Sequence, residues 1–152
     1  MIQRIQTIYL FFASLFMGIS LFIPIVTFTT KNEVWKLTSF SLSTANISVS
    51  TVWLGILMVV ATVLPLVIIF LFKNRQLQVR LCGVEAVVLL GVLVLIGIYF
   101  FLGDRLLADF VITDRMFGWA APMPIVSMIL VLLATRAIYK DEVLVRSLDR
   151  IR

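Results

Sequence analysis

Among the long apolar stretches of this chain, only one contains an acidic side chain. Residues 81–102 read LCGVEAVVLLGVLVLIGIYFFL, and Glu85 is the carboxylate among them. Removing a carboxylate from water is costly unless the group is paired, hydrogen-bonded or protonated, so an acidic residue in such a stretch is a candidate functional residue. The chemistry that it offers is proton or cation binding, or a polar contact with another protein segment.

Three hypotheses account for Glu85. In the first, it is a structural carboxylate that is protonated or hydrogen-bonded to nearby groups such as Gln3, Gln6 or Arg80. In the second, it meets a basic or hydroxyl group of a partner chain or of a second copy. In the third, it is the proton or cation site of a small transporter. Proton relays generally use several ionisable groups, and this chain offers a single one near one membrane face, which weakens the third hypothesis.

Other reactive groups are scarce. The sequence contains no His, and Cys82 is its one Cys, which excludes an internal disulfide and argues against zinc and against His- or Cys-dependent catalysis. The acids that remain as possible cation ligands are Asp104, Asp109 and Asp114. Their spacing matches no cation-binding loop, and arginines adjoin two of them, so we interpret them as solvated charges. We predict that the protein is not an enzyme and holds no metal or cofactor.

The composition is typical of a membrane protein. Of 152 residues, 62% are hydrophobic and 14% are charged, and the mean hydropathy is +1.14. Soluble domains contain about 45–50% apolar and about 25% charged residues. The stretches long enough to cross a bilayer as helices are residues 5–26, 51–72, 81–102 and 119–139. The sequence therefore predicts an all-α integral membrane protein, with four transmembrane helices in one antiparallel bundle spanning residues 1–152.

Small residues mark the faces on which these helices are expected to pack. They are Ser14 and Gly18 in the first stretch, and Gly83, Gly91 and Gly97 in the third. At about 100° per residue the three glycines fall on the side opposite Glu85. A helix with glycines on one face and a carboxylate on the other is expected to pack against other segments on both faces. One internal core does not easily cover both.

Two features interrupt the helical pattern. Pro65 lies inside the second stretch, where it removes a backbone hydrogen bond, and we expect a kink and a candidate hinge there. Residues 27–50 alternate apolar and polar side chains in short runs around Asn46. That pattern indicates either a short β-hairpin in the first external loop or an irregular loop at the membrane surface.

Basic residues set the expected orientation. Of the 13 Lys and Arg residues, nine lie in the two ends and the short loop between the second and third stretches, and four lie in the other two loops. Because cytoplasmic segments collect Lys and Arg, we expect both termini in the cytoplasm.

The tail, residues 140–152, reads as an amphipathic cytoplasmic helix. Its candidate interaction surface consists of Leu144, Leu148 and Ile151 with Arg146 and Arg150. We expect it to continue the fourth helix or to lie on the membrane surface. Acids are interspersed among its basic residues, so we do not expect it to bind nucleic acid.

Both ends of the chain resemble those of a known family. MIQRIQTIYL at residues 1–10 and RAIYKDEVLVRSLDR at residues 136–150 are similar to the opening and closing motifs of a bacterial membrane-protein family, domain of unknown function 4293 (DUF4293). The four apolar stretches between these motifs also fit, so the resemblance covers the whole chain. It implies a four-helix protein of the bacterial inner membrane without an established activity, and it supplies no catalytic or ligand residues.

These observations favour a structural or accessory subunit of a membrane complex. Its expected partners are the lipid bilayer and either other membrane subunits or a second copy of itself. The alternative is a small transporter or ligand-binding protein that uses Glu85.

Overall fold

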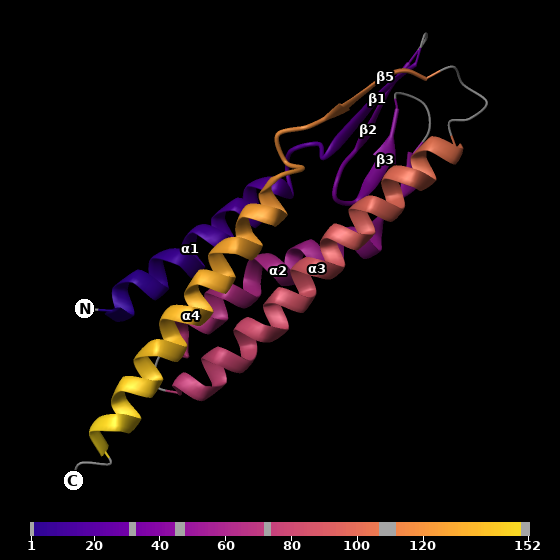
Figure 1. The fold of residues 1–152 in the computed structure, drawn as a ribbon. Coiled ribbons are helices and arrows are strands. Elements are labelled where there is room, and N and C mark those ends of the chain that lie inside the picture. The colour runs from indigo at the N-terminus through magenta and orange to yellow at the C-terminus, as the bar shows by residue number, and fades with distance from the viewer. Residues whose placement is uncertain (1, 31–32, 45–47, 72–73, 107–111, 150–152) are drawn as a thin grey trace.

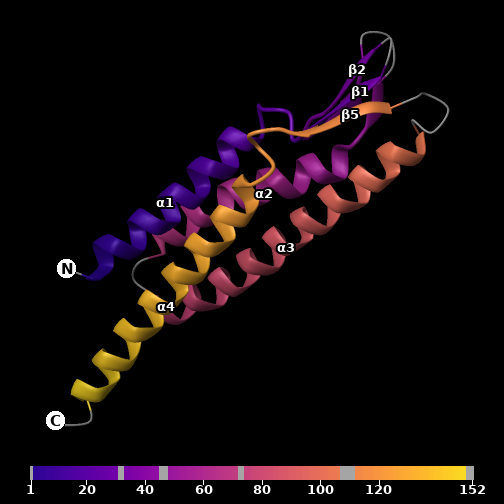
Figure 2. The same cartoon turned by 45° about the horizontal axis from the view of Figure 1, so that its top comes forward.

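In a computed structural model the chain forms four packed helices and one sheet (Figure 1). The structure describes residues 2–30, 33–44, 48–71, 74–106 and 112–149, with the backbone alone at 2–4, 104, 106, 112–113, 142 and 144–149. The helices are α1 (Ile2–Ser20), α2 (Val52–Phe70), α3 (Arg75–Leu106) and α4 (Met123–Asp149). Helix α1 packs against α2 and α4, and α3 packs against the same two helices. Figure 2 shows that the two chain ends lie at one end of these helices, which we call the terminal end, and that the sheet lies at the other, the sheet end.

The all-α prediction is wrong in one respect, because the loops build a sheet of five described strands. They are β1 (Val26–Thr30), β2 (Val34–Leu37), β3 (Ser41–Ser43), β4 (Ser48–Ser50) and β5 (Ile112–Phe117). Their order is β4-β3-β2-β1-β5, and all neighbouring strands are antiparallel. The predicted hairpin corresponds to β3 and β4, whose pairing sets Leu42 opposite Val49. Its turn, with Asn46, lies outside the described residues.

The first helix ends earlier than predicted. Helix α1 stops at Ser20, and β1 begins at Val26. Pro24 lies between them and disfavours continuation of the helix. The residues after it, VTFTT, are β-branched or aromatic, and they alternate between buried and half-buried positions. The apolar stretch at residues 5–26 therefore begins as a helix and ends at the first residue of a strand.

The sheet is anchored on the sheet end of α3. Phe28 is fully buried, its ring centroid lies 5.7 Å from that of Phe100, and a Cβ on Gly103 would lie 3.1 Å from its ring. On α2, Gly55 leaves room for the ring of Phe40, which a larger residue would strike. Helix α3 thus extends beyond the apolar part of the four packed helices, and the sheet packs against this end of α3.

Three described helices are long and apolar enough to cross a membrane, over Val52–Phe70, Arg75–Gly103 and Met123–Asp141. The described apolar part of α1 is shorter, Ile5–Ser20. Helix α4 begins at Met123 rather than near Trp119, after turn residues that include Pro122. Its backbone runs without a break to Asp149 (Figure 1), so the tail continues the fourth helix rather than turning across the membrane surface.

Candidate functional site: a buried carboxylate among the helices

Glu85 lies on the face of α3 that points into the protein. The buried positions of α3 recur every three or four residues, at Gln78, Cys82, Glu85, Leu89, Val92 and Ile96. This spacing keeps one stripe of a helix toward its neighbours. Glu85 is 0% exposed as a result, and it contacts neither solvent nor lipid in the isolated chain.

Neither oxygen of the Glu85 carboxylate has a hydrogen-bond partner among the described residues. Arg80, one of the partners expected from the sequence, lies on the exposed side of α3. The side chain of Gln3 lies outside the described residues. An unsatisfied buried carboxylate costs several kcal/mol in order-of-magnitude terms, so a proton, a water or a ligand is needed to satisfy it.

Gln6 of α1 is a second buried group without a partner in the described part of the chain. Its side chain is 7% exposed, and its amide nitrogen has no acceptor. The amide offers donors and the Glu85 carboxylate offers acceptors, so the two groups are chemically complementary.

Two contacts indicate that Gln6 and Glu85 lie at similar depth. The Ser127 hydroxyl of α4 donates to the Ala13 carbonyl of α1 at 3.0 Å, and Thr135 of α4 lies close to the Cys82 side chain of α3. From the Ser127 contact, Thr135 is about 12 Å and Gln6 about 10 Å toward the terminal end. Glu85 lies one turn from Cys82, so it and Gln6 are within about one helical turn in depth.

Polar contacts close the interior at the terminal end. The Gln78 amide donates to the Ile68 carbonyl of α2 at 2.9 Å, and Arg75 of α3 forms an ion pair with Asp141 of α4 at 2.9 Å. Sequence reasoning missed Gln78, Thr135 and Asp141. The recurrence of Gln78, Cys82 and Glu85 at helical spacing was the available signal.

A family model for "Domain of unknown function (DUF4293)" matches residues 2–151, almost the whole chain. The chain belongs to the DUF4293 family. No curated protein matches it. Membership confirms the resemblance of the two end motifs and attaches no activity to Glu85.

The small residues of this DUF4293 member divide into two groups. Ser14 donates to the Thr62 carbonyl of α2 at 2.7 Å, and a Cβ on Gly18 would meet the Thr62 side chain at 3.5 Å. A Cβ on Gly91 would lie 3.0 Å from Leu57 of α2. By contrast, a Cβ on Gly83 or Gly97 would meet nothing within 4 Å. Among the described residues, one side of α3 is therefore left uncovered at these two glycines.

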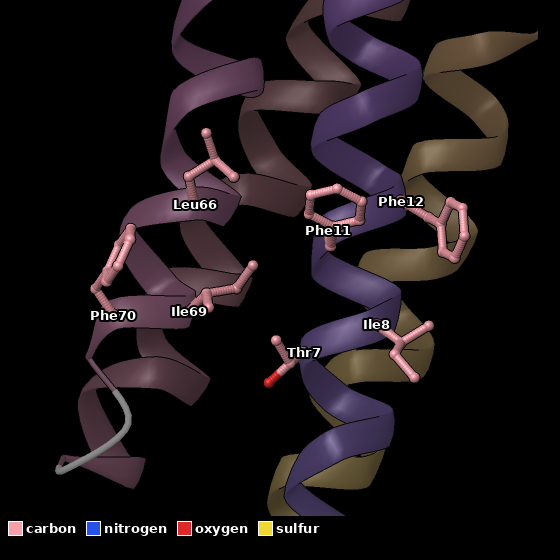
Figure 3. Close-up of a pocket in the computed structure, with 7 residues that line it drawn as sticks. All are labelled: Thr7, Ile8, Phe11, Phe12, Leu66, Ile69 and Phe70. Atoms are coloured by element: carbon pink, nitrogen blue, oxygen red, sulfur yellow. The ribbon is translucent and has the colours of Figure 1, made fainter.

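The hollows on the outside of α1 and α2 are apolar. Figure 3 shows one of about 360 Å³, lined by Thr7, Ile8, Phe11, Phe12, Leu66, Ile69 and Phe70. A second, of about 330 Å³, shares Phe11 and Leu66 and continues toward Phe22. Both hollows are lined almost entirely by apolar side chains, and neither lining includes Glu85. Together they form a groove suited to hydrocarbon chains rather than to a polar substrate.

The remaining predicted positions form no second site in the described regions. Pro65 is buried and α2 continues through it as one helix. Of the loop acids, Asp114 lies in β5, whereas Asp109 and the side chain of Asp104 lie outside the described residues. The backbone at Leu144, Arg146 and Leu148 belongs to α4, and Arg150 and Ile151 are outside the description. No group of three or more potential metal ligands occurs among the described side chains.

Proposed function

We propose that this DUF4293 member is a non-enzymatic structural or accessory subunit of a membrane complex in the bacterial inner membrane. Its four helices cross the bilayer as an antiparallel bundle, its termini lie in the cytoplasm, and its sheet lies on the outer side. The observation that carries the proposal is the open side of α3 at Gly83 and Gly97, against which no described residue packs.

Exposed aromatic residues support the membrane placement. Phe22, Trp53, Phe101 and Trp119 come from all four helices or their ends at the sheet end, and each is more than two-thirds exposed. At the terminal end Phe70 and Tyr139 are also exposed. Trp53 and Phe70 are about 26 Å apart along α2, close to the hydrocarbon thickness of a bilayer. Trp and Tyr favour the membrane interfaces, so Trp53 and Trp119 at one end and Tyr139 at the other fit a bilayer between the two groups.

The position of α1 supports the fourth crossing. Helix α1 lies beside α2 and α4, which are both long and apolar enough to span. The Ser14–Thr62 contact lies near the middle of α1 and α2, and Ser127, near the start of α4, contacts Ala13. Because its neighbours occupy the hydrocarbon layer, α1 occupies it too. The excess of Lys and Arg in the segments of the terminal end favours a cytoplasmic location for that end.

The packing surface supports the accessory role. Close helix approach in membranes depends on small residues, since these let backbones come near enough for van der Waals contact. Gly83 and Gly97 are four turns apart on α3, so they define a face that runs along the helix. An apolar helix of another subunit fits this face.

Substitution of Gly97 by Leu tests the proposal. Space around Gly97 is open in the chain itself, so the variant is expected to insert and fold normally. After purification in mild detergent from native membranes, we expect co-purifying subunits at fixed stoichiometry with the unaltered protein and at least about a tenfold loss with Gly97→Leu.

Ile129→Leu is the control, because Ile129 is about half exposed and lies on α4 rather than on α3. It should leave the co-purifying subunits unchanged. Equal recovery of partners from both variants, or no partner with the unaltered chain, would contradict the proposal.

One observation favours a second candidate, a small transporter. Glu85 is fully buried and neither of its oxygens has a partner in the described structure. A group in that state can bind a proton or a small cation that enters the interior. A transporter of this kind would lose flux on substitution of Glu85 by Gln, whereas an accessory subunit would not.

A further inference from the structure

The inward-facing stripe of α3 changes character at Glu85. Starting from the terminal end, its first positions carry polar or ionisable side chains: Arg75, Gln78, Cys82 and Glu85. The buried positions that follow toward the sheet end are apolar: Leu89, Val92 and Ile96. Successive positions are three or four residues apart, so all of them share one face of the helix. The interior along α3 therefore has a polar half, about 15 Å long, next to the terminal end, and an apolar half next to the sheet end.

Side chains of the neighbouring helices follow the same division. The polar half also receives Gln6 of α1 and Thr135 and Asp141 of α4. In the apolar half, the hydroxyls of Ser14 and Ser127 donate to carbonyls of α2 and α1 at 2.7 and 3.0 Å. The hydrogen-bond donors of these two serines are thus used within the protein.

Buried polar atoms that lack hydrogen-bond partners gather in the polar half. Among the described residues of the helices, they occur at Gln6, Arg75 and Glu85. Arg75 is also ion-paired with Asp141, and these two side chains are 29% and 16% exposed, so the polar half meets solvent at the terminal end. Gln6 needs an acceptor and Glu85 needs donors. Water supplies both, and buried waters typically join polar groups of this kind.

A small side chain leaves room next to Glu85. The Gln78 amide donates to the Ile68 carbonyl, which places these two residues at one depth. Ala61 of α2 and Glu85 of α3 each lie about two helical turns from that contact, toward the sheet end, so they also share a depth. Ala61 is fully buried, and its methyl group fills less space than the Leu and Met side chains further along the buried face of α2. A water beside the carboxylate therefore meets a short side chain of α2.

We propose that the polar half is a hydrated entry that opens at the terminal end and closes beyond Glu85, and that Glu85 binds protons at its inner end. A hydronium ion gives its proton to a carboxylate oxygen of Glu85 and remains in the entry as water. Ionisable residues of membrane helices generally face water-containing interiors of this kind. The buried stripe from Leu89 to Ile96 offers no group that accepts the proton next, so the proton leaves through the same entry. Glu85 therefore exchanges protons with the compartment of the chain ends and does not carry them across the membrane.

The charges around Glu85 fit a proton better than a metal cation. Glu85 is the only acidic or basic side chain that is buried in the described structure. The described side chains of α1 and α2 are neither acidic nor basic, and the described basic side chains of α4 are exposed. The other titratable group of the buried stripe is the Cys82 thiol, and Arg75 and Asp141 compensate each other at the entry. A bound divalent cation would require further oxygen ligands, whereas a proton neutralises the carboxylate by itself.

Silver ions test the entry. In a Cys82→Ala background, Glu85→Cys places a thiol at the proposed site. Leu89→Cys is the matched control, because Leu89 is also fully buried and lies about one turn further along the same stripe. Silver nitrate is added to sealed membrane vesicles with the terminal end outward or inward, and mass spectrometry counts the thiols that remain free for alkylation after denaturation. From the terminal end, we expect silver to block Glu85→Cys about tenfold faster than Leu89→Cys, and from the sheet end both should react slowly.

Infrared spectroscopy tests the unaltered site. The carbonyl band of the protonated Glu85 carboxyl is identified by its loss in Glu85→Gln. In purified protein reconstituted into vesicles, transfer to D2O should shift this band within minutes, because water in the entry exchanges the carboxyl proton. Raising the pH should weaken the band, since the carboxyl then releases its proton. Gln6→Leu has a side chain of similar size without the amide, so it should slow the exchange about threefold.

Three outcomes would overturn the inference. They are equal silver rates at the two thiols, faster reaction of Glu85→Cys from the sheet end, and a carboxyl band that is absent or does not exchange in D2O. The inference rests on the membrane placement in the proposed function and not on the partner subunit, so the two fail separately. Loss of co-purifying subunits would remove the accessory role alone, and an unreactive Glu85→Cys with intact co-purification would remove the entry alone.

Discussion

At the level of single residues, Glu85 stands out because a carboxylate occupies a buried position where its burial is energetically costly. It occupies the buried stripe of α3 between Cys82 and Leu89, where an apolar residue would pack without penalty. Its oxygens lack partners in the described structure, and the complementary amide of Gln6 lies at a similar depth. A proton on the carboxylate would remove its charge, and a water between the two groups would give each of them a hydrogen-bond partner.

Glu85→Gln separates the two candidate functions. The amide has nearly the same volume, so we expect insertion, partner association and thermal stability to change little, within about 1 kcal/mol. Proton and cation flux in reconstituted vesicles should be the same for both proteins and equal to that of empty vesicles. A flux that the unaltered protein supports and Glu85→Gln removes would instead establish transport.

At the level of elements, α3 joins the apolar layer to the sheet. Its inner stripe packs among the helices, and its last turns carry Phe100 and Gly103 against Phe28 of β1. At the opposite end, the Arg75–Asp141 ion pair ties its first turn to the extension of α4. Helix α3 therefore contributes to the relative placement of the sheet and the helices, together with the contact of Phe40 at Gly55 of α2.

Phe28→Ala should detach the sheet from α3. Phe28 is fully buried, and truncating a buried Phe costs about 3–5 kcal/mol. We expect faster proteolysis and faster amide exchange in β1 and β5, with little change in the middle of α1 and α4. The control is Thr27→Ala on the half-buried face of the same strand, for which the change should be small. Uniform loss of the whole fold would show that the sheet and helices unfold together.

At the level of the whole molecule, the segment that follows the first helix and the segment that precedes the last helix meet in one sheet. Strand β5, close to the start of α4, pairs with β1, close to the end of α1, so the sheet connects the first and last helices. The two chain ends lie together at the terminal end (Figure 2). With the helices crossing a bilayer as proposed, such an arrangement requires an even number of crossings.

Cysteine labelling tests this topology. Ser48→Cys in β4 and Lys140→Cys in α4 are exposed positions at opposite ends, while the native Cys82 is buried and should react slowly. An impermeant maleimide applied to intact cells should label Ser48→Cys at once and Lys140→Cys only after the membrane is opened. The reverse pattern would invert the proposed orientation, and equal labelling of both would rule out a bilayer between them.

The sequence alone determined the features that depend on local composition. Long apolar runs require helices in hydrocarbon, since only internal hydrogen bonds satisfy the backbone there, and the two end motifs placed the chain in its family. The inward position of Glu85 could have been read from the helical recurrence of Gln78, Cys82 and Glu85, because periodicity is itself local information.

Only the tertiary structure decided what depends on residues far apart in the chain. Strand β5 has β1 as its partner across the length of two helices, and no local pattern at residues 112–117 specifies that pairing. Likewise, Gly91 packs on Leu57 whereas Gly83 and Gly97 stay open, although all three have the same residue type. Sequence periodicity defines which face a side chain occupies, but only the packed helices determine whether another element covers that face.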